Sequence, residues 1–284
     1  MTNSDLNTKV DEAIKLLRLF SSSVQQQPDP ILELSYSGGK DSDVILRLAQ
    51  MAGIPFQAIY KNTTIDPPGT IAHCQQNGVE IVKPKHSFLE LVKTKGMPTR
   101  RARFCCRYLK EYKIHANAIQ GIRRSESVKR TKNYSPDDPI ICRNYGAKKN
   151  HVNIALPILN WTYEDIESFI SRENIKCHKL YYNPDGSFNV SERLGCIGCP
   201  LQADQGLADY KAYPKMFKAM AKALCIWWET HPNTKSRKKF ETPYNLIGHN
   251  LFFRTYAKYY LETYTLFYTI DWKQRLEETF SIEL

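Results

Sequence analysis

The residues best suited to chemistry form one run of six, Ser37-Gly38-Gly39-Lys40-Asp41-Ser42. An apolar run at 31–34 precedes it and an amphipathic stretch at 43–49 follows it, which predicts a strand, a glycine turn and the start of a helix. The first N–H groups of a helix lack partners within the helix and lie at the positive end of its dipole, so they bind phosphate readily. The spacing excludes a Walker A loop, which needs G-x-x-x-x-G-K-[ST]. We therefore expect a phosphate-binding loop of another kind.

Cysteines form the second group of candidate residues. The chain holds eight, and four of them stand in two pairs, Cys105-Cys106 and Cys196-Ile197-Gly198-Cys199. Such a set predicts a metal site. Adjacent cysteines are hard to direct at one tetrahedral Zn²⁺ because successive side chains diverge, whereas the separated irons of a [4Fe–4S] cluster can each take one thiolate. We predict a [4Fe–4S] cluster on Cys105, Cys106, Cys196 and Cys199, with Zn²⁺ as the alternative. The other cysteines are expected to be buried thiols: Cys74, Cys142, Cys177 and Cys225.

Positive charge is concentrated in one part of the chain. The formal net charge is +11, and the window from Lys93 to Lys132 contains thirteen Lys or Arg residues against two acids. The remaining residues are balanced, so this window carries the whole excess and predicts an anionic partner. Two interpretations stay open: a nucleotide pocket with a solvated basic rim, and a groove for a nucleic-acid backbone.

Length and patterning limit the class of protein. A chain of 284 residues can form one large α/β domain, or a core domain with a helical extension. It contains no apolar run of about 18 residues, and its first ten residues lack the basic and apolar regions of a signal peptide. We expect a cytoplasmic protein with no membrane partner, and reduced cysteines that serve as ligands or buried thiols.

Predicted strands and helices alternate along the first two thirds of the chain. Strands are expected at 31–34, 56–60, 79–82, 116–122, 140–142 and 153–159, and helices at 10–20, 43–49, up to 76, at 88–93, at 104–113 and from a capping box at Thr162. This order predicts an α/β fold: a mostly parallel twisted sheet with helices on both faces. Ligands of such sheets bind at the carboxyl ends of the strands, where the glycine run, Thr63–Asp66 and Arg123-Arg124 fall.

The C-terminal part reads differently, as helical and rich in aromatic residues. We expect an α/β nucleotide-binding domain over 1–205, including the cysteines, and a helical extension over 206–284. Aromatic side chains at helical spacing are expected to pack in the core, to form a subunit interface as in a homodimer, or to stack on bases: Phe252, Tyr256, Tyr259, Tyr260 and Phe267.

On these motifs the chain resembles the PP-loop ATP pyrophosphatases and, over about residues 31–200, the phosphoadenylyl-sulfate and adenylyl-sulfate reductases, which share the adenine nucleotide α-hydrolase-like fold. Ser37–Ser42 is similar to the family's pyrophosphate loop at all six positions. Residues 121–127 are similar to its G-I-R-R-x-x-S segment, whose arginines contact phosphates, and 156–166 to its P-L-x-x-W-T-x-x-D-V helix start. Thr63–Asp66 occupies the place of a segment beside the adenosine. The resemblance implies a nucleotide site on Ser35, Ser37, Gly38, Gly39, Lys40, Asp41, Ser42, Thr63, Asp66, Gly121, Arg123 and Arg124.

The cysteine pattern narrows the resemblance to two branches. It is similar to that of the [4Fe–4S] adenylyl-sulfate reductases and to that of the ATP pyrophosphatases of bacterial DNA phosphorothioation. The reductases use a cysteine in a C-terminal E-C-G-[IL]-H segment, whereas no cysteine follows Cys225 in this sequence. Cys225 stands in an apolar helical context that suits a buried, inert thiol better than a nucleophile. The resemblance therefore implies ATP hydrolysis rather than reduction.

The predicted reaction is cleavage of ATP between its α and β phosphates, which activates an acceptor oxygen for replacement by sulfur. Lys40 and Arg123 would neutralise the leaving pyrophosphate. Asp41 would either hold Mg²⁺ through water or cap the helix. The predicted partners are a nucleic acid, by resemblance DNA rather than tRNA, and a cysteine desulfurase or another sulfur donor.

Two alternatives remain from the sequence. One is a sulfonucleotide reductase of sulfate assimilation, with Cys225 as the late candidate nucleophile. The other is a component that carries an iron–sulfur cluster and binds nucleic acid without catalysing a reaction. Fold alone does not decide among them.

Overall fold

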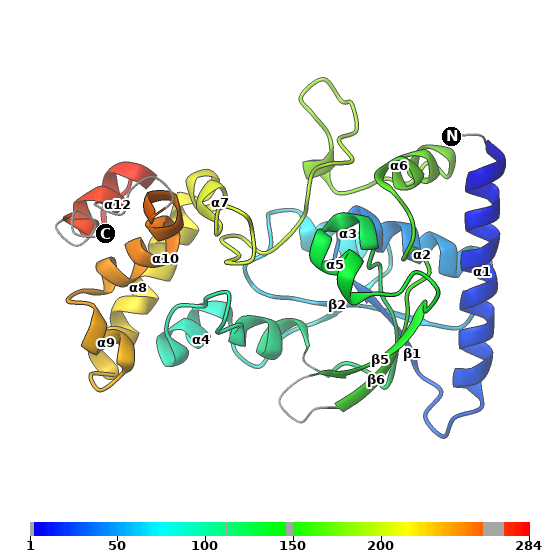
Figure 1. The fold of residues 1–284 in the computed structure, drawn as a ribbon, viewed down its shortest axis with the longest axis horizontal. Helices are drawn as coiled ribbons and strands as arrows, with labels where there is room; N and C mark the ends of the chain where they lie inside the picture. The colour runs from blue at the N-terminus through cyan, green and yellow to red at the C-terminus, as the bar shows by residue number, and fades with distance from the viewer. Residues whose placement is uncertain (1–2, 112, 146–149, 258–269) are drawn as a thin grey trace. The chain divides into compact units, whose positions relative to one another are not determined.

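The structure is a computed structural model, and it describes residues 3–111, 113–145, 150–257 and 270–284 (Figure 1). Contacts between Cα atoms divide the chain into two compact units. The first unit comprises Met1–Asn62, Pro67–Pro84 and Lys110–Leu194, and the second comprises Thr63–Asp66, Lys85–Leu109 and Gly195–Leu284. This division places two internal segments in the same unit as the C-terminal part, and the domain boundary expected at 205/206 stays a prediction. All four candidate cluster cysteines belong to the second unit.

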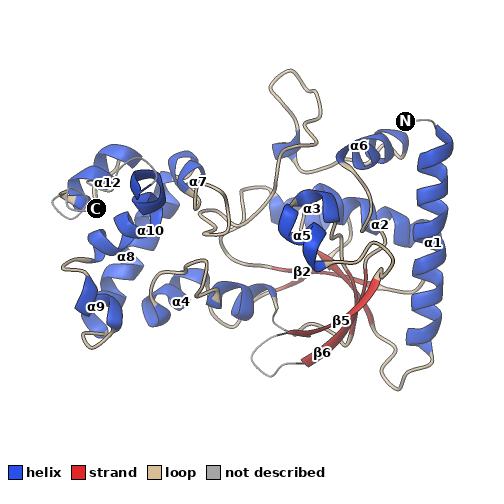
Figure 2. Cartoon of the chain, in the orientation of Figure 1, coloured by secondary structure: helices blue, strands red, loops and turns tan. Residues whose placement is uncertain are grey.

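The first unit is built on a six-stranded sheet with the strand order β3-β2-β1-β4-β6-β5 (Figure 2). The strands are β1 Leu32–Tyr36, β2 Gln57–Lys61, β3 Glu80–Val82, β4 Asn117–Ile119, β5 Ile140–Tyr145 and β6 Asn150–Ala155. All neighbours pair in parallel except β5, which runs antiparallel to β6. The predicted fold class is therefore confirmed. The strand expected at 116–122 is shorter, since pairing ends at Ile119.

Helices cover this sheet unequally. The α-helices of the first unit are α1 Asn3–Gln25, α2 Lys40–Ala52, α3 Thr70–Gln76, α5 Val128–Asn133 and α6 Tyr163–Arg172. Helices α1, α2 and α6 pack together on the larger core, in which Leu17, Leu34 and Phe169 are fully buried. The opposite face carries a smaller cluster that includes Ala118 and Ile154. Successive strand residues point to opposite faces, which is why Ala118 and Ile119 enter different clusters.

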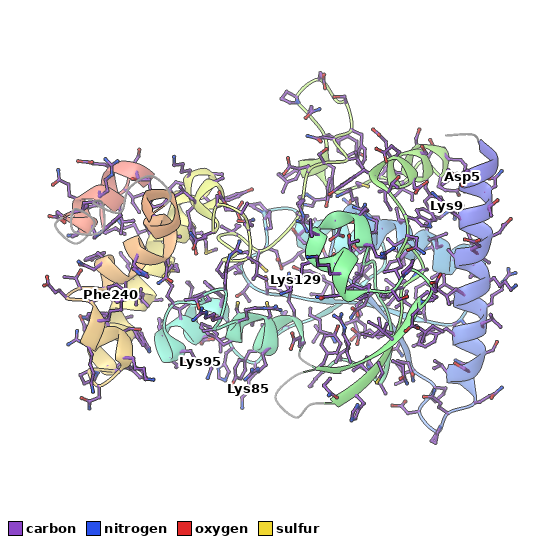
Figure 3. The ribbon with its side chains drawn as sticks, viewed as in Figure 1. Asp5, Lys9, Lys85, Lys95, Lys129 and Phe240 are labelled. Atoms are coloured by element: carbon purple, nitrogen blue, oxygen red, sulfur yellow. The ribbon has the colours of Figure 1, made fainter. Side chains whose placement is uncertain are left out.

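The predicted capping box at Thr162 is confirmed. The Thr162 side chain accepts from the Asp165 N–H, and the Asp165 carboxylate accepts from the Thr162 N–H at 2.7 Å. Asp165 also accepts from Lys9 Nζ at 2.8 Å, and Lys9 lies 3.8 Å from Asp5 on α1 (Figure 3). One buried carboxylate thus both starts α6 and fixes it to α1.

The second unit is helical. Its elements are α4 Phe88–Lys95, the π-helical turn Cys106–Lys110, α7 Leu207–Ala212, α8 Pro214–Thr230, α9 Lys235–Lys239, α10 Pro243–Ala257 and α12 Trp272–Phe280. Its core includes Phe217, Leu224 and Trp272. The helix expected over 104–113 is shorter, because a helical turn at Phe104 passes directly into the π-helical turn.

Few of the C-terminal aromatic predictions can be followed in the structure. Phe252 is buried and packs on Trp272, with ring centroids 5.5 Å apart, so it belongs to the core. The Tyr256 side chain and residues Tyr259, Tyr260 and Phe267 lie outside the described part of the chain. Among the other cysteines, Cys142 is exposed on the edge strand β5, so its expected burial is wrong, and Cys225 is half-buried. No helix within the described ranges has both the length and the apolar character needed to cross a bilayer.

Candidate functional site

The glycine loop, Ser37–Ser42, joins β1 to α2 as predicted. Gly38 has φ +78°, and a Cβ there would lie 3.0 Å from Thr70 Cγ2 and 3.1 Å from Leu194 Cδ2. Gly39 is the N-cap of α2, and its carbonyl accepts from the N–H groups of Ser42 at 2.8 Å and Asp43 at 3.1 Å. Both positive φ and close packing therefore require glycine at position 38, and the turn directs the first amides of α2 outward.

A buried polar network lies beneath this loop. The Asp43 carboxylate accepts from the Tyr36 hydroxyl and lies 2.9 Å from His73 Nε2. Burial raises the pKa of Asp43, and the hydrogen bond and charge of His73 oppose that shift. Since Tyr36 ends β1, Asp43 opens α2 and His73 lies on α3, the network holds three elements in one geometry around the loop.

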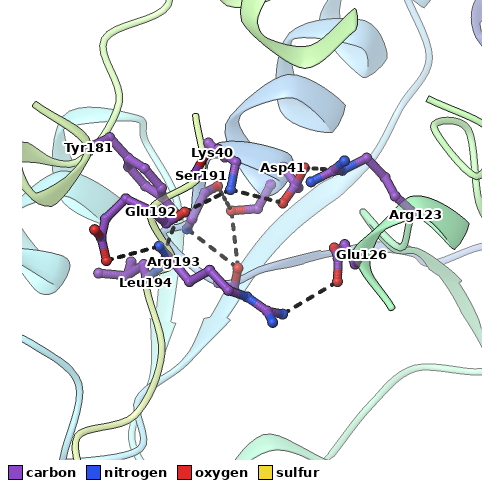
Figure 4. A network of polar contacts seen from close by, with 12 residues as sticks. Lys40, Asp41, Arg123, Glu126, Tyr181, Ser191, Glu192, Arg193 and Leu194 are labelled. Carbon is purple, nitrogen blue, oxygen red and sulfur yellow. Dashed lines mark hydrogen bonds and ion pairs between the residues drawn. The ribbon is translucent and has the colours of Figure 1, made fainter. Parts of the chain in front are cut away.

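Lys40 is a buried cation at the start of α2, only 2% exposed. Its Nζ donates to the Glu192 carbonyl at 3.0 Å and lies 3.8 Å from Asp41 Oδ2, above the Tyr181 ring (Figure 4). Burial lowers the pKa of Lys40, while the neighbouring Asp41 charge opposes this. A cation held in so little water interacts strongly with any phosphate that reaches it.

Arg123 is fully buried and faces the loop from the segment after β4. Its Nε donates to Asp41 Oδ1 at 2.7 Å, its Nη1 donates to Ser125 Oγ at 3.0 Å, and its guanidinium stacks 4.5 Å from the Tyr163 ring centre. Its Nη2 has no hydrogen-bond partner among the described residues. Arg123 is thus fixed in place with one donor still unsatisfied.

These contacts favour neither of the two roles expected for Asp41. The helix N-cap is Gly39 and receives no side-chain capping bond, so Asp41 does not cap α2. Its carboxylate lies between Arg123 and Lys40, both cations, which leaves it poorly suited to hold Mg²⁺. A Cβ on Gly121 would come within 2.9 Å of the Asp41 carbonyl oxygen, so glycine at 121 lets the Arg123 segment approach.

A polar cavity of about 170 Å³ opens over the loop. Its lining brings together seven of the predicted nucleotide-site residues: Ser35, Ser37, Gly39, Lys40, Asp41, Ser42 and Gly121. Arg124 does not line it; its Nε donates instead to the Tyr134 carbonyl at 3.0 Å, which ties the segment after β4 to the end of α5.

Five lining residues were not predicted from the sequence: Glu126, Arg130, Tyr181, Arg193 and Leu194. Glu126 pairs with Arg130 and lies 3.5 Å from Arg193. The Tyr181 hydroxyl accepts from the Leu194 N–H at 3.1 Å. Glu126 and Arg130 are four residues apart in the sequence, a local signal that could have found them, although Ser127 separates the 3-10 turn of Glu126 from α5. No local sequence pattern indicates that residues 181–194 lie against the glycine loop.

Thr63 and Asp66 lie in the second unit, beside the cysteine turn. The Thr63 N–H donates to Asp66 Oδ2 at 3.3 Å, and Cys196 Sγ donates to Thr63 Oγ1 at 3.6 Å. The Ile197 N–H also donates to the Ile65 carbonyl at 2.8 Å. A contact between this segment and a nucleotide stays a prediction.

The four candidate cluster cysteines are all half-buried in the second unit. The pKa of Cys105 is raised by its hydrogen bond to Cys106, by burial and by the nearby thiols of Cys106 and Cys196. Within the described residues, however, no three Cys, His, Asp or Glu side chains converge on the position of a single metal ion. The predicted [4Fe–4S] cluster and the zinc alternative therefore both stay predictions.

Comparison with known families agrees with the loop and the sheet. Residues 31–202 match the phosphoadenosine phosphosulfate reductase domain, which covers more than half of the chain. The chain belongs to this family. The match spans β1 to the cysteine turn, and therefore includes the glycine loop, the Arg123 segment and the predicted cluster residues.

The individual proteins that the chain resembles share limited sequence identity with it. An uncharacterized protein of Methanocaldococcus jannaschii is 32% identical over 210 residues, which are 68% of this chain and 47% of the relative. The chain thus spans about half of that relative's length. Among solved structures, the phosphoadenylyl-sulfate reductase of Candida auris in its phosphate complex is 16% identical, with a TM-score of 0.45, over 69% of this chain and 96% of that one. The U34-tRNA thiolase NcsA of Methanococcus maripaludis with its [4Fe-4S] cluster is 13% identical, with a TM-score of 0.38, over 81% and 82%.

Proposed function

We propose that this chain is an ATP pyrophosphatase that adenylylates an acceptor so that sulfur can enter a nucleic acid. The observation that carries the proposal is the cavity over the glycine loop, where the N-terminus of α2 meets Lys40, Arg130 and Arg193. Donors and cations gathered on one side of a small polar cavity suit a polyphosphate. Family membership supports an adenine nucleotide as the ligand.

The proposed reaction is a substitution at the α-phosphorus of ATP. The acceptor oxygen, which is unprotonated in a phosphodiester or a base carbonyl, forms a bond to that phosphorus, and the bond to the α–β bridging oxygen breaks. Pyrophosphate leaves with the electron pair. Sulfide from a donor then displaces AMP from the activated acceptor, so no net oxidation or reduction takes place in these two steps.

The predicted site residues around the glycine loop each have a role in that substitution. The amides of Gly38–Lys40 and the hydroxyls of Ser37 and Ser42 hold the leaving pyrophosphate. Lys40 gives up the Glu192 carbonyl to contact phosphate. Arg123 does not line the cavity, so its unsatisfied Nη2 has to turn toward the developing charge when the nucleotide binds. Asp41 acts as a positioning residue, because it fixes Arg123 through a 2.7 Å hydrogen bond. Catalysis of this type depends on position and charge rather than on a covalent intermediate.

Cys105, Cys106, Cys196 and Cys199 would hold the [4Fe–4S] cluster. When bound by all four thiolates, such a cluster would supply a negatively charged, electron-transferring centre with no open iron. Cys199→Ser is expected to lower the iron content of anaerobically purified protein and to remove the visible absorption of the cluster. Cys142→Ser, which removes an exposed cysteine of the first unit, is the matched control. Equal iron content in both variants would contradict this ligand set.

The reductase alternative is less well supported by the geometry. Cys225 lies on α8 with its Sγ 3.8 Å from the Tyr244 hydroxyl, and burial raises its pKa. A nucleophilic thiol needs the opposite shift, toward the thiolate. This is the physical ground for preferring ATP over a sulfonucleotide as substrate.

The experiment that separates these functions is calorimetric titration of anaerobically purified protein with ATP, adenylyl sulfate and phosphoadenylyl sulfate in parallel. We expect ATP to bind most tightly. Tighter binding of either sulfonucleotide, with sulfite released in the presence of a thiol, would replace the pyrophosphatase by the reductase.

A further inference from the structure

A second cavity, of about 320 Å³, lies wholly within the second unit. Its lining combines a cationic rim with amide and aromatic side chains: Arg100, Arg101, Gln205, Tyr210, His249 and Asn250. Pockets for small ligands begin at about this volume, roughly 300 Å³. None of these residues takes part in the site over the glycine loop.

Tyr210 places a phenol on the wall of the cavity. The side chain is only 2% exposed, and its hydroxyl is not among the fully buried atoms that lack a hydrogen-bond partner, so the hydroxyl is open to the cavity that Tyr210 lines. It is therefore available as a donor and an acceptor to a polar group of a ligand. Gly198 (φ +69°) lets the ring pass, because a Cβ at 198 would collide with the phenol.

The wall beside Tyr210 is rigid and belongs to the cysteine turn. Asp209 Oδ2 accepts from the Gly198 N–H at 2.9 Å and from Gln202 Nε2 at 2.8 Å. Arg100 donates to the carbonyls of Pro200 at 2.9 Å and of Gln202 at 2.7 Å. Several side chains thus hold the turn around Cys199 in one shape, and the cavity is preformed.

A cationic surface continues from the rim of this cavity. Within Lys85–Leu109 seven Lys or Arg residues accompany one acid, Glu90. Lys85 precedes α4 and Lys95 ends it (Figure 3), and Lys95 Nζ lies 4.6 Å from the centre of the half-exposed Tyr108 ring. All seven cations are exposed and form no ion pair with any described acid: Lys85, Lys93, Lys95, Arg100, Arg101, Arg103 and Arg107.

We propose that the second unit binds single-stranded nucleic acid, with one unpaired nucleotide in the Tyr210 cavity and the adjoining phosphates on the surface of Arg101, Arg103 and Arg107. This inference rests on the proposed function, since it places that function's nucleic acid. Unpaired arginines bind phosphodiesters through a planar, two-pronged donor set. A cavity lined by amides, an imidazole and a phenol suits the polar edge of a base, which is accessible only in an unpaired nucleotide.

The chemistry favours nucleic acid over a lipid surface. An anionic membrane is bound by cations beside an apolar face that enters the lipid. Here the cations adjoin a polar cavity, and the exposed aromatic residue, Tyr108, lies under Lys95. Exposed aromatic rings beside cations are typical of surfaces on which bases stack.

The test is fluorescence anisotropy of labelled single-stranded DNA and RNA oligonucleotides with the full chain, without ATP, over a series of KCl concentrations. We expect binding that weakens with salt. Arg101→Gln with Arg103→Gln should weaken it about tenfold and reduce the slope of log K against log salt by about 1.4. The control pair, Lys15→Gln with Lys176→Gln, removes two exposed cations of the first unit and should bind as the wild type does.

Tyr210→Phe tests the cavity separately. The variant keeps the edge-to-face packing on Phe217, with ring centroids 5.2 Å apart, and loses only the hydroxyl. We expect about a fivefold loss of oligonucleotide affinity with the salt slope unchanged. Calorimetric binding of ATP by the same proteins reports separately on the glycine loop, so failure of this inference is distinguishable from failure of the proposed function.

Three outcomes would overturn the inference: no oligonucleotide binding, equal loss in the control pair, or wild-type affinity in both the arginine and the Tyr210 variants. Binding of free mononucleotides alone would replace the strand by a small ligand. Binding of phosphatidylserine vesicles without oligonucleotide binding would replace it by a membrane.

Discussion

The two cavities differ in how their charges are partnered. Over the glycine loop each charged group has a partner from its own unit: Lys40 has the Glu192 carbonyl, Arg123 has Asp41, and Arg193 has Glu126. Around the Tyr210 cavity the exposed arginines have no acid, and the phenol has no hydrogen-bond partner among the described residues.

An anion that binds over the glycine loop must replace existing contacts of the charged groups, whereas an anion that binds at the second unit meets cations without such contacts. A phosphate entering the loop has to replace internal contacts, so its binding depends on groups that are already oriented and little hydrated. An anion at the second unit meets cations that are still hydrated, so its binding depends mainly on charge and salt. We therefore expect catalysis at the cavity over the glycine loop. We expect the Tyr210 cavity and its cationic surface to bind a large anionic partner.

The largest predicted effect comes from removing the buried cation of the loop. Lys40→Ala should lower the rate of pyrophosphate release from ATP by about 10² to 10³, the loss typical of one charge-stabilising group. The rate is measured by a coupled pyrophosphate assay. Lys176→Ala, which removes an exposed lysine of the same unit, should leave it unchanged. Activity close to wild type in Lys40→Ala would favour a non-catalytic binding protein.

The pairing of Asp41 with Arg123 is tested by a double-mutant cycle. Arg123→Gln should lower kcat about 100-fold and Asp41→Asn about tenfold with little change in KM, and the double variant should be no worse than Arg123→Gln alone. Additive effects would show that Asp41 does not act through Arg123. The matched control is the Arg47–Glu173 pair, which joins α2 to the C-cap of α6 with 3.0 Å between charged atoms and whose removal should not affect kcat.

Alanine substitutions at two glycines with similar φ angles separate the effect of close packing from the effect of backbone strain. Gly38→Ala and Gly186→Ala each place a side chain at positive φ, +78° and +83°, at a cost of about 1 kcal/mol in the free energy of unfolding. Only Gly38→Ala adds contacts at 3.0 and 3.1 Å, so it alone should also weaken ATP binding, by about tenfold. Equal ATP affinity of the two variants, measured by calorimetry, would show that the loop is not the phosphate site.

The smallest predicted effect is a pH dependence in the second unit. Burial, with the charge of Lys239, lowers the pKa of His249 from 6.5 to about 4. The unfolded chain therefore takes up this proton first as the pH falls, and His249 contributes stability that is present above pH 6.5 and is lost toward pH 4.

His249→Gln should flatten the decline in the free energy of unfolding over that range, whereas the exposed His86→Gln should not. The measurement is urea unfolding followed by tryptophan fluorescence, since Trp227, Trp228 and Trp272 lie in the second unit. Parallel pH curves for wild type and His249→Gln would contradict the assignment.

The sequence predicted those features that depend on neighbours along the chain. The glycine loop, the strand before it and the Thr162–Asp165 capping box are local patterns, and all three are confirmed. The partners that complete the loop come from far along the chain, because Leu194 and Glu192 reach Gly38 and Lys40 across about 150 residues. No local periodicity encodes such a return, so Tyr181 and Arg193 were missed. The same limit applies to Thr63, whose neighbours belong to the distant cysteine turn.

The most direct test of the account is to identify the products of ATP turnover by the anaerobically purified, cluster-loaded protein, with and without single-stranded nucleic acid and a sulfide source. Cleavage between the α and β phosphates predicts pyrophosphate and AMP, with no ADP. ADP with orthophosphate, or no turnover under any of these conditions, would contradict the assignment of the glycine loop as an adenylylating site.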